Sequence, residues 1–195
     1  MSYRPVPEIR TERLTMTLAR TDHAKLFVDF FDQNRARFDP WDPPRPDNFY
    51  TTAWWESRIT QDHEEFQGER ALRLTLFDRH RENGPIVGHC HFTQMARGPF
   101  QACTLGYAVD HRYAGRGYMR EAASAAIAHI FNEMGFHRVM ANYSPMNDRS
   151  GALLRRLGFS VEGYARDYLF INGQWRDHIL TAITNPNPTP PPRRT

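Results

Sequence analysis

The stretch that decides the fold is Val109-Asp110-His111-Arg112-Tyr113-Ala114-Gly115-Arg116-Gly117-Tyr118-Met119. It starts at the end of a strand-like segment and finishes in the first turn of a predicted helix, with two glycines one residue apart between them. Glycine adopts left-handed backbone conformations and lets a ligand approach the main chain closely. The free amides and the dipole at the start of a helix attract anions. On the glycine spacing alone, a phosphate site and a tight turn that packs a helix on a sheet explain the pattern equally well.

The strands before this turn disfavour a nicotinamide dinucleotide fold. That fold requires a third glycine and a parallel strand-helix-strand unit. Here three strand-like segments, at residues 71–77, 86–92 and 103–109, are separated by turn residues. Segments arranged in this way predict an antiparallel meander. The two glycines therefore follow the last strand of a meander.

On the amino-terminal side, the sequence predicts a strand followed by two helices. Residues 13–18 alternate polar and apolar side chains, and a helix is expected over residues 21–33. Residues 34–48 hold four prolines around Trp41, so we expect an irregular but ordered loop that is pinned by the tryptophan. The second helix is expected over residues 50–67.

On the carboxyl-terminal side, helices and strands alternate. We expect, in chain order, a small-residue helix over residues 117–134, a strand over 138–143, a short helix over 147–157 and two strands within 164–184. Gly135 and Gly158 are placed to end the two helices. Asn172-Gly173 is a typical turn between two antiparallel strands.

These elements predict one α+β domain, with a mixed, mostly antiparallel central sheet flanked by helices. A chain of 195 residues is long enough to bury a single core without disulfides or metal. We expect the domain to cover residues 1–184. Residues 185–195 carry five prolines and are expected to form an extended, flexible tail.

The composition, 40% hydrophobic and 24% charged, is typical of a soluble globular protein. No stretch is apolar enough to span a bilayer or to serve as a secretory signal, so we expect a cytoplasmic protein without a membrane partner. In that reducing compartment Cys90 and Cys103 are expected to be reduced and half-buried. The net charge of +3 suits an anionic ligand or a nucleic-acid-rich particle, but it is not a DNA-binding signature.

Arg112, three residues before Gly115, completes the pattern Arg-x-x-Gly-x-Gly. This pattern resembles the pyrophosphate-binding signature of the GCN5-related N-acetyltransferase (GNAT) superfamily. The resemblance extends to residue 184 and is most specific to the RimJ and RimL branch, with the alanine-specific RimJ group the most similar. The stretches that carry it are Thr11-Glu12-Arg13-Leu14, Asn34-Arg35, Pro40-Trp41-Asp42-Pro43, His137-Arg138-Val139-Met140-Ala141-Asn142-Tyr143, Asn147-Asp148-Arg149-Ser150-Gly151 and Asn172-Gly173-Gln174-Trp175-Arg176-Asp177-His178. Each stretch alone is weak, but together they imply a GNAT fold that uses acetyl-CoA as co-substrate and needs no metal.

The resemblance also implies where acetyl-CoA binds. In the family, the strand before the signature hydrogen-bonds the pantetheine arm, and the amides of the following loop hold the pyrophosphate. An asparagine further along the chain bonds the pantetheine amide. The residues implied to bind the coenzyme are Val109, Arg112, Gly115, Arg116, Gly117, Tyr118, Met119 and Asn147.

Two catalytic residues are implied in the same way. Ser150 matches the hydroxyl that protonates the departing thiolate, and Asp167 matches the carboxylate that draws the proton from the amine. Ser150 can also be interpreted as a helix-surface hydroxyl, and Asp167 as a solvated or turn-capping carboxylate. The nine histidines show no metal-ligand spacing, and His89 and His91, which alternate along a strand, are interpreted as structural.

The function implied by the resemblance is that of an enzyme that transfers an acetyl group from acetyl-CoA to the N-terminal α-amine of a protein. The expected acceptor is the N-terminal alanine of a small-subunit ribosomal protein, and the expected partner is that terminus or the small ribosomal subunit. The enzyme itself is expected to be a monomer or a homodimer. Two alternatives stay open: an acetyltransferase of a small amine such as an antibiotic or polyamine, and a non-catalytic acyl-CoA-binding module in ribosome assembly.

Overall fold

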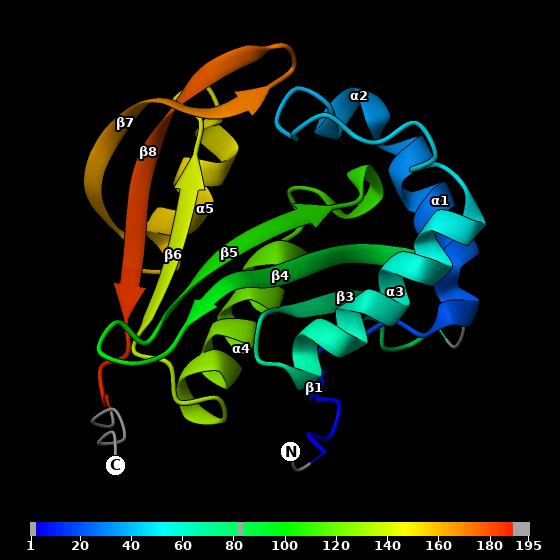
Figure 1. The fold of residues 1–195 in the computed structure, drawn as a ribbon, viewed down its shortest axis with the longest axis horizontal. Helices are drawn as coiled ribbons and strands as arrows, with labels where there is room; N and C mark the ends of the chain where they lie inside the picture. Colours follow the sequence, from blue (N-terminus) through cyan, green and yellow to red (C-terminus); the bar gives the residue numbers. More distant parts are fainter. Residues whose placement is uncertain (1–2, 82–83, 189–195) are drawn as a thin grey trace.

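The computed structural model describes residues 3–81 and 84–188, which form one eight-stranded sheet in the order β1-β2-β3-β4-β5-β6-β8-β7 (Figure 1). Its centre is the predicted antiparallel meander of β3 (Leu72–Asp78), β4 (Ile86–Ala96) and β5 (Ala102–Val109). Side chains along these strands alternate between the two faces of the sheet. Leu74 on β3 is paired with Cys90 on β4, and both side chains are fully buried. Antiparallel β2 (Leu14–Thr17) and β1 (Glu8–Arg10) extend this side of the sheet.

The meander joins the rest of the sheet through one parallel pair. β6 (Arg138–Tyr143) pairs with β5 over only three positions, from Ala102↔Arg138 to Thr104↔Met140, and the two strands then part. A parallel connection needs a long crossover, which α4 (Tyr118–Asn132) supplies. β8 (Gln174–Thr184) and β7 (Ser160–Ile171) complete the sheet as an antiparallel hairpin beyond β6.

Helices cover both faces of the sheet and create two cores. On one face α4 lies against β4 and β5, with α5 (Asp148–Arg156) beside β6. On the other face α1 (Ala24–Gln33) and α3 (Thr52–Gln67) pack an aromatic cluster against the sheet. In this cluster Trp55 stacks on Phe27, with ring centroids 4.4 Å apart, and on Phe31, with centroids 5.1 Å apart. Apolar burial on two faces of one sheet confirms the predicted α+β class.

The proline-rich segment differs from the expectation in two ways. Residues 34–48 were predicted to be irregular throughout, but Arg35–Phe38 forms the short helix α2, because the first proline comes only at position 40. The predicted anchor, Trp41, stays 39% exposed. Arg45 holds the loop instead: its guanidinium pairs with Asp39 and Asp42 at 2.9 and 2.7 Å and lies 5.0 Å from the ring centre of Phe31.

Several element boundaries also differ from the prediction. The helix predicted over residues 21–33 begins with one 3-10 turn, η1 (Thr21–His23), and β7 begins at Ser160, four residues before the predicted segment. β1 was missed, because a three-residue edge strand carries too little pattern. The predicted turn is confirmed: Asn172 and Gly173 have φ of 50° and 76°, as a two-residue hairpin turn requires.

At the expected start of the tail, Asn185 still packs against the domain, and its amide donates a hydrogen bond to the His137 carbonyl at 2.7 Å. Residues 186–188 form neither helix nor strand, and residues 189–195 of the predicted tail lie outside the described residues. Both cysteines are free and buried, and burial raises the pKa of each thiol to about 12. Within the described ranges, no helix has the length and apolarity needed to cross a membrane.

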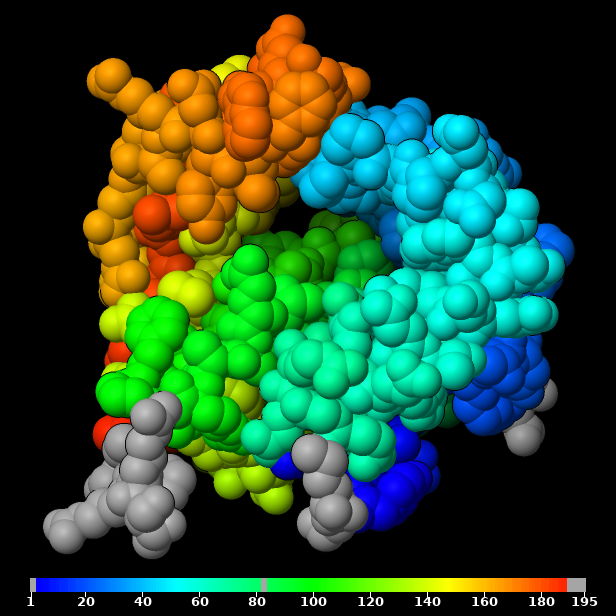
Figure 2. Space-filling model, in the orientation of Figure 1, coloured from blue at the N-terminus to red at the C-terminus, as the bar shows by residue number. Residues whose placement is uncertain are grey.

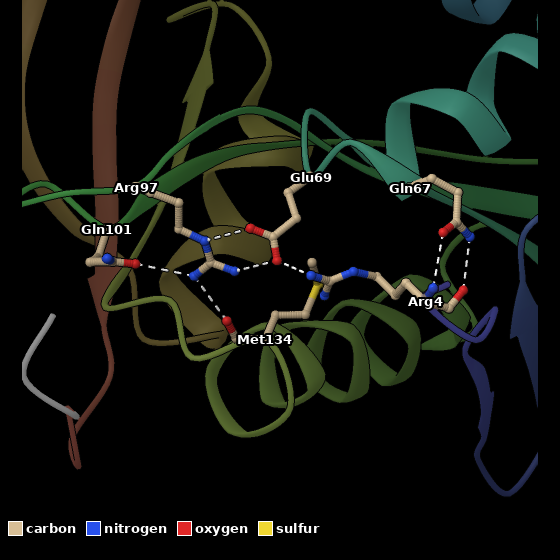
Figure 3. Close-up of polar contacts among 6 residues, drawn as sticks. All are labelled: Arg4, Gln67, Glu69, Arg97, Gln101 and Met134. Atoms are coloured by element: carbon tan, nitrogen blue, oxygen red, sulfur yellow. Dashed lines mark hydrogen bonds and ion pairs between the residues drawn. The ribbon is translucent and has the colours of Figure 1, made fainter. Parts of the chain in front are cut away.

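A polar network ties four distant segments together at the end of the molecule where β5 and β6 are still paired (Figure 3). Its centre is Arg97, which follows β4 and donates to both carboxylate oxygens of Glu69 at 3.1 Å. Arg97 also donates to the Gln101 side chain and the Met134 carbonyl, while Arg4 pairs with Glu69 from the other side. The network therefore lies at the end of the sheet opposite the point where β5 and β6 part.

The first prediction concerns how closely α4 approaches the sheet. Ala126 is fully buried, whereas Ala128, two residues away on the same helix, is exposed. Ala126→Leu should lower the free energy of unfolding by about 1–3 kcal/mol, because three added carbon atoms overpack a closed core. Ala128→Leu is the matched control and should change it by less than about 0.5 kcal/mol. Urea denaturation measures both, and equal stabilities would contradict the packing described for α4.

Candidate active site

A cavity of about 1080 Å³ lies where β5 and β6 part. Figure 2 shows it as a hollow between the β7–β8 hairpin and the segment that holds α2 and the proline-rich loop. Its floor includes Val109 at the end of β5, and its walls include Trp41 from the loop and Asn172 from the hairpin turn. The cavity therefore brings together parts of the chain more than 100 residues apart.

Strand alternation gives the cavity two different sides. Tyr107 is paired with Cys90, so its side chain lies on the face covered by α4 and α5, whereas Gly106 and Ala108 lie on the face of α1 and α3. On the other wall Asn142 is paired with Leu180, which shares a face with His178 two residues away. One side of the cavity thus opens toward α4 and α5, and the other toward the hairpin and the proline-rich loop.

The glycine turn presents a row of free amides to the first side. Gly115 and Gly117 have φ of 75° and 82°, left-handed values that favour glycine, and α4 begins directly after Gly117. The amides of residues 115–120 have no hydrogen-bond partner among the described residues. Free amides at a helix N-terminus are suited to bind phosphate.

Asp110 holds the approach to this turn. Its carboxylate is fully buried and accepts hydrogen bonds from the Arg112 amide at 2.8 Å, from the Arg112 side chain at 2.8 and 3.1 Å, and from Asn34 at 2.9 Å. Burial alone would raise the pKa of Asp110, but the hydrogen bonds from Arg112 and Asn34 outweigh it and keep the pKa below its ordinary value. Both the amide and the side chain of Arg112 are therefore engaged within the protein.

A second brace links the amino-terminal strand to α4. Glu121 accepts hydrogen bonds from the Arg13 amide at 2.9 Å and from the Arg13 guanidinium at 2.7 Å. Arg13 also donates to the Arg116 carbonyl at 3.0 Å and lies 4.0 Å from the ring centre of Tyr118. The stretch Thr11-Glu12-Arg13-Leu14, singled out in the sequence, thus fixes the conformation of the glycine turn.

The start of α5 places two predicted residues on the cavity. Asn147 caps the helix: its Oδ1 accepts from the Ser150 amide at 3.2 Å, which leaves its Nδ2 free to donate. The Ser150 hydroxyl lies 2.7 Å from the hydroxyl of Tyr107 on β5. Burial raises the pKa of Tyr107 to about 12, so this phenol keeps its proton at neutral pH.

Asp167 lies elsewhere. It is exposed on β7 and is not among the residues that line the cavity. The register of β7 shifts between Ala165 and Leu169, and within this bulge Asp167 has a φ of 48° and donates its amide to Asp177 at 2.9 Å. Bulges re-aim side chains, and a left-handed non-glycine residue often marks a functional site. The role of Asp167 as the base stays a prediction.

Tyr168 lies in the same bulge and contacts residues of β6 and β8. Its hydroxyl accepts a hydrogen bond from the Asn142 side chain at 2.9 Å, and its ring centre lies 5.3 Å from that of His178. His178 is only 4% exposed and lines the cavity together with Asn142. Two polar side chains, Asn142 from β6 and His178 from β8, thus line this side of the cavity, and Tyr168 contacts both.

Positive charge dominates the cavity. Its only carboxylate among the described residues is Asp42, which is paired with Arg45. Its arginines are Arg37, Arg120, Arg149, Arg156 and Arg176. Burial and the nearby charge of Arg149 lower the pKa of Arg37. A cavity of this composition is suited to an anionic ligand.

The structure brings most of the predicted site together. The predicted residues that line the cavity are Val109, Gly115, Gly117, Tyr118, Met119, Asn147 and Ser150. Arg112, Arg116 and Asp167 do not line it. Sequence analysis missed Tyr107, Asp110 and His178, although His178 ends one of the stretches quoted for the family resemblance. Among residues 3–81 and 84–188, no group of three or more His, Cys, Asp or Glu side chains is arranged to hold a metal.

Comparison with known proteins agrees with this geometry. The family model described as acetyltransferase (GNAT) domain matches residues 13–160. The chain is similar to the [ribosomal protein uS5]-alanine N-acetyltransferase of Escherichia coli, with 42% identity over 187 residues and 95% of each chain covered. It is also similar to the probable N-acetyltransferase YjcK of Bacillus subtilis, with 32% identity over 155 residues, 80% of this chain and 84% of the relative.

Solved structures give the same result. The ribosomal-protein-S5-alanine acetyltransferase of Vibrio fischeri superposes with a TM-score of 0.89 at 34% identity, covering 94% of this chain and 100% of the other. RimJ of Mycobacterium smegmatis in complex with CoA-disulfide superposes with a TM-score of 0.82 at 25% identity, covering 92% of this chain and 86% of the other. The chain therefore belongs to the GNAT family and is an N-acetyltransferase, as the signature around Gly115 and Gly117 predicted.

Proposed function

We propose that the protein transfers the acetyl group of acetyl-CoA to the α-amine of an N-terminal alanine, with a protein of the small ribosomal subunit as acceptor. The observation that carries the proposal is the two-sided cavity, with free main-chain amides at the start of α4 on one side and polar side chains on the other. The similarity to an enzyme named [ribosomal protein uS5]-alanine N-acetyltransferase supports this acceptor. The reaction would take place in the cytoplasm, where ribosomal proteins are made.

The first side would hold acetyl-CoA. The free amides of residues 115–120, aligned with the α4 dipole, would bind the pyrophosphate. Arg112 would serve this site by bracing Asp110, whose hydrogen bonds fix the turn. The pantetheine arm would run along the end of β5 at Val109, where no strand pairs on that side, and would accept a hydrogen bond from Asn147 Nδ2. The thioester then reaches the point where β5 and β6 part.

Ser150 would act on the departing sulfur. The Tyr107 phenol can donate to the Ser150 oxygen, which directs the serine proton toward the cavity. A thiol has a reference pKa of about 8.5, so its thiolate needs only a hydrogen bond or partial protonation to leave. Complete transfer of the tyrosine proton would be unfavourable, since the pKa of Tyr107 is raised to about 12. Tyr107 therefore orients Ser150 rather than acting as the acid itself.

The acceptor needs little activation. An α-amine has a reference pKa of about 7.7–8.0, so a substantial fraction of its molecules is unprotonated near neutral pH. A lysine side chain, at about 10.4, is several hundred-fold less deprotonated. A site with no strong base would therefore favour N-terminal amines. Asp167, the predicted base, could reach such an amine only through ordered waters, because it lies outside the cavity.

A direct test of the proposal uses the natural acceptor. The protein is incubated with acetyl-CoA and purified ribosomal subunits, and mass spectrometry identifies the chain that gains an acetyl group. We expect the modification at the N-terminal alanine of one small-subunit protein. Acetylation of a small amine only, or no turnover with any acceptor, would favour one of the two alternative functions.

Gly117→Asp should abolish measurable acetyl-CoA binding, because it adds a negative charge at the pyrophosphate site. A Cβ at Gly117 would meet only Arg13 Nη2, at 3.5 Å, so there is space for the side chain, and the strain of the positive φ is smallest for Asp and Asn among the residues other than glycine. Gly117→Asn is the matched control, since asparagine has the same shape without the charge and accepts the φ of 82° equally well. Calorimetric titration compares the two variants. Equal affinities would exclude the turn as the pyrophosphate site.

Ser150→Ala and Tyr107→Phe should each lower kcat about tenfold, the effect of about 1.4 kcal/mol, and leave the acetyl-CoA dissociation constant unchanged. The double variant should be no slower than Ser150→Ala alone, because Tyr107 acts through Ser150. Tyr143→Phe on β6 is the control, since its hydroxyl makes no hydrogen bond to a described residue. Steady-state kinetics measure all four variants. Additive losses would show that the two hydroxyls act independently.

A peptide that begins with alanine should be acetylated, and the same peptide with a blocked α-amine and a free internal lysine should not. The difference follows from the pKa gap of about two and a half units between the two amines. Replacing the alanine by tryptophan should also lower the rate, because a site fitted to a methyl group excludes a large ring. Peptide assays at saturating acetyl-CoA measure both effects. A rate on the lysine peptide equal to that on the alanine peptide would refute N-terminal specificity.

A further inference from the structure

His178 is a buried residue of the sheet whose side chain lines the cavity. It lies on β8 opposite Ala165, just beyond the last pair between β8 and β6, Tyr143↔Ile179. Its side chain lines the cavity, yet the residue as a whole is only 4% exposed. A buried imidazole at the wall of a substrate cavity is in a position to exchange a proton with the substrate.

The hydrogen bonds of the ring decide which nitrogen is available. Nδ1 lies 3.0 Å from the carbonyl oxygen of Arg176, and a carbonyl can only accept, so Nδ1 carries the hydrogen. In the neutral ring, Nε2 then has the free lone pair. Nε2 has no partner among the described residues, and it is not one of the sealed, unpartnered nitrogens such as Nδ1 of His89 and His137. The lone pair therefore remains accessible.

His178 lies on the side of the cavity that is proposed to hold the acceptor. His178 shares its face of the sheet with Asn142, which is opposite the face that carries Ser150 and Tyr107. Tyr168, held by Asn142, covers the ring from the hairpin side. An amine bound on this side of the cavity would lie next to His178, and a thioester bound on the side of α4 and α5 would lie next to Ser150.

We propose that His178 Nε2 accepts the proton that the acceptor amine loses. This inference deepens the proposed function and rests on it, because it assigns a base to the same reaction. An imidazole suits the task better than an exposed carboxylate, since general bases work best with a pKa near the working pH, and reference values are about 6.5 for imidazole and about 3.9 for aspartate.

The step balances as follows. The amine lone pair forms a bond to the thioester carbon, and the carbonyl π electrons move to oxygen. The proton on the new ammonium passes to His178 Nε2. The oxygen electrons then re-form the carbonyl, the C–S bond breaks, and sulfur leaves with the bonding pair, accepts a hydrogen bond from Ser150 and takes a proton from water. The imidazolium returns its proton to water.

The test measures acetylation of the alanine peptide by the full-length protein and by three variants. His178→Gln and His178→Ala should each lower kcat at least about 100-fold, the usual contribution of a general base, with acetyl-CoA affinity within twofold of wild type. Added imidazole should restore part of the rate of His178→Ala, which a purely structural role would not allow. Asp167→Asn removes the carboxylate that the family resemblance implies as the base, and it should lower kcat less than about fivefold.

A His178→Gln rate within about threefold of wild type would overturn the proposal, and so would an Asp167→Asn loss as large as that of His178→Gln. If His178→Ala fails to fold, as judged by circular dichroism and acetyl-CoA titration, the His178→Gln rate decides. A wild-type enzyme that ignores the peptide but acetylates a small amine would refute the proposed function, and the same variants would then test His178 with that amine. An enzyme inactive with every amine would refute both.

Discussion

The parting of β5 and β6 is the constraint on which the rest of the structure depends. Two parallel strands joined by a helix can stay paired along their length, but here the ladder ends after Thr104↔Met140. The unpaired edge of β5 then presents backbone polar groups that need a partner, and an extended ligand can supply one. The pair stays closed at its other end, where Ala102 pairs with Arg138 and the Arg138 amide donates to the Gln101 carbonyl.

Where the sheet is open, strand pairing does not hold the neighbouring segments in place. Three arginines hold these segments through side-chain contacts. Arg112 and Asp110 hold the strand end against α1, Arg13 and Glu121 hold the start of α4, and Arg45 holds the proline-rich loop. Each of these arginines meets a carboxylate and so contributes little net charge to the cavity. The arginines that line the cavity have no such partner among the described residues, which leaves their charge available to a ligand.

In the proposed mechanism, the two reactants bind on opposite faces of the sheet. Alternation places Tyr107 and Ser150 on the face of α4 and α5, and His178 and Asn142 on the opposite face. A coenzyme that arrives from the first face and an amine that arrives from the second can touch only where the strands part. The proposed mechanism thus uses one group, Ser150, for the sulfur and a different group, His178, for the amine.

The sequence by itself determined the order of the elements, the meander, the glycine turn and the family, because these depend on neighbours in the chain: alternation, helix caps, and glycines where φ must be positive. It also placed Asn147 and Ser150 at the start of one helix. It did not determine that Arg35–Phe38 is helical, that Arg45 replaces Trp41 as the anchor of the loop, or that Asp167 lies outside the cavity. Only the tertiary structure decided that Tyr107 meets Ser150, 43 residues away, and that His178 lines the cavity. Contacts of this kind depend on strand register and on the bulge in β7. Both are fixed by packing across the whole sheet, so no local sequence pattern predicts them.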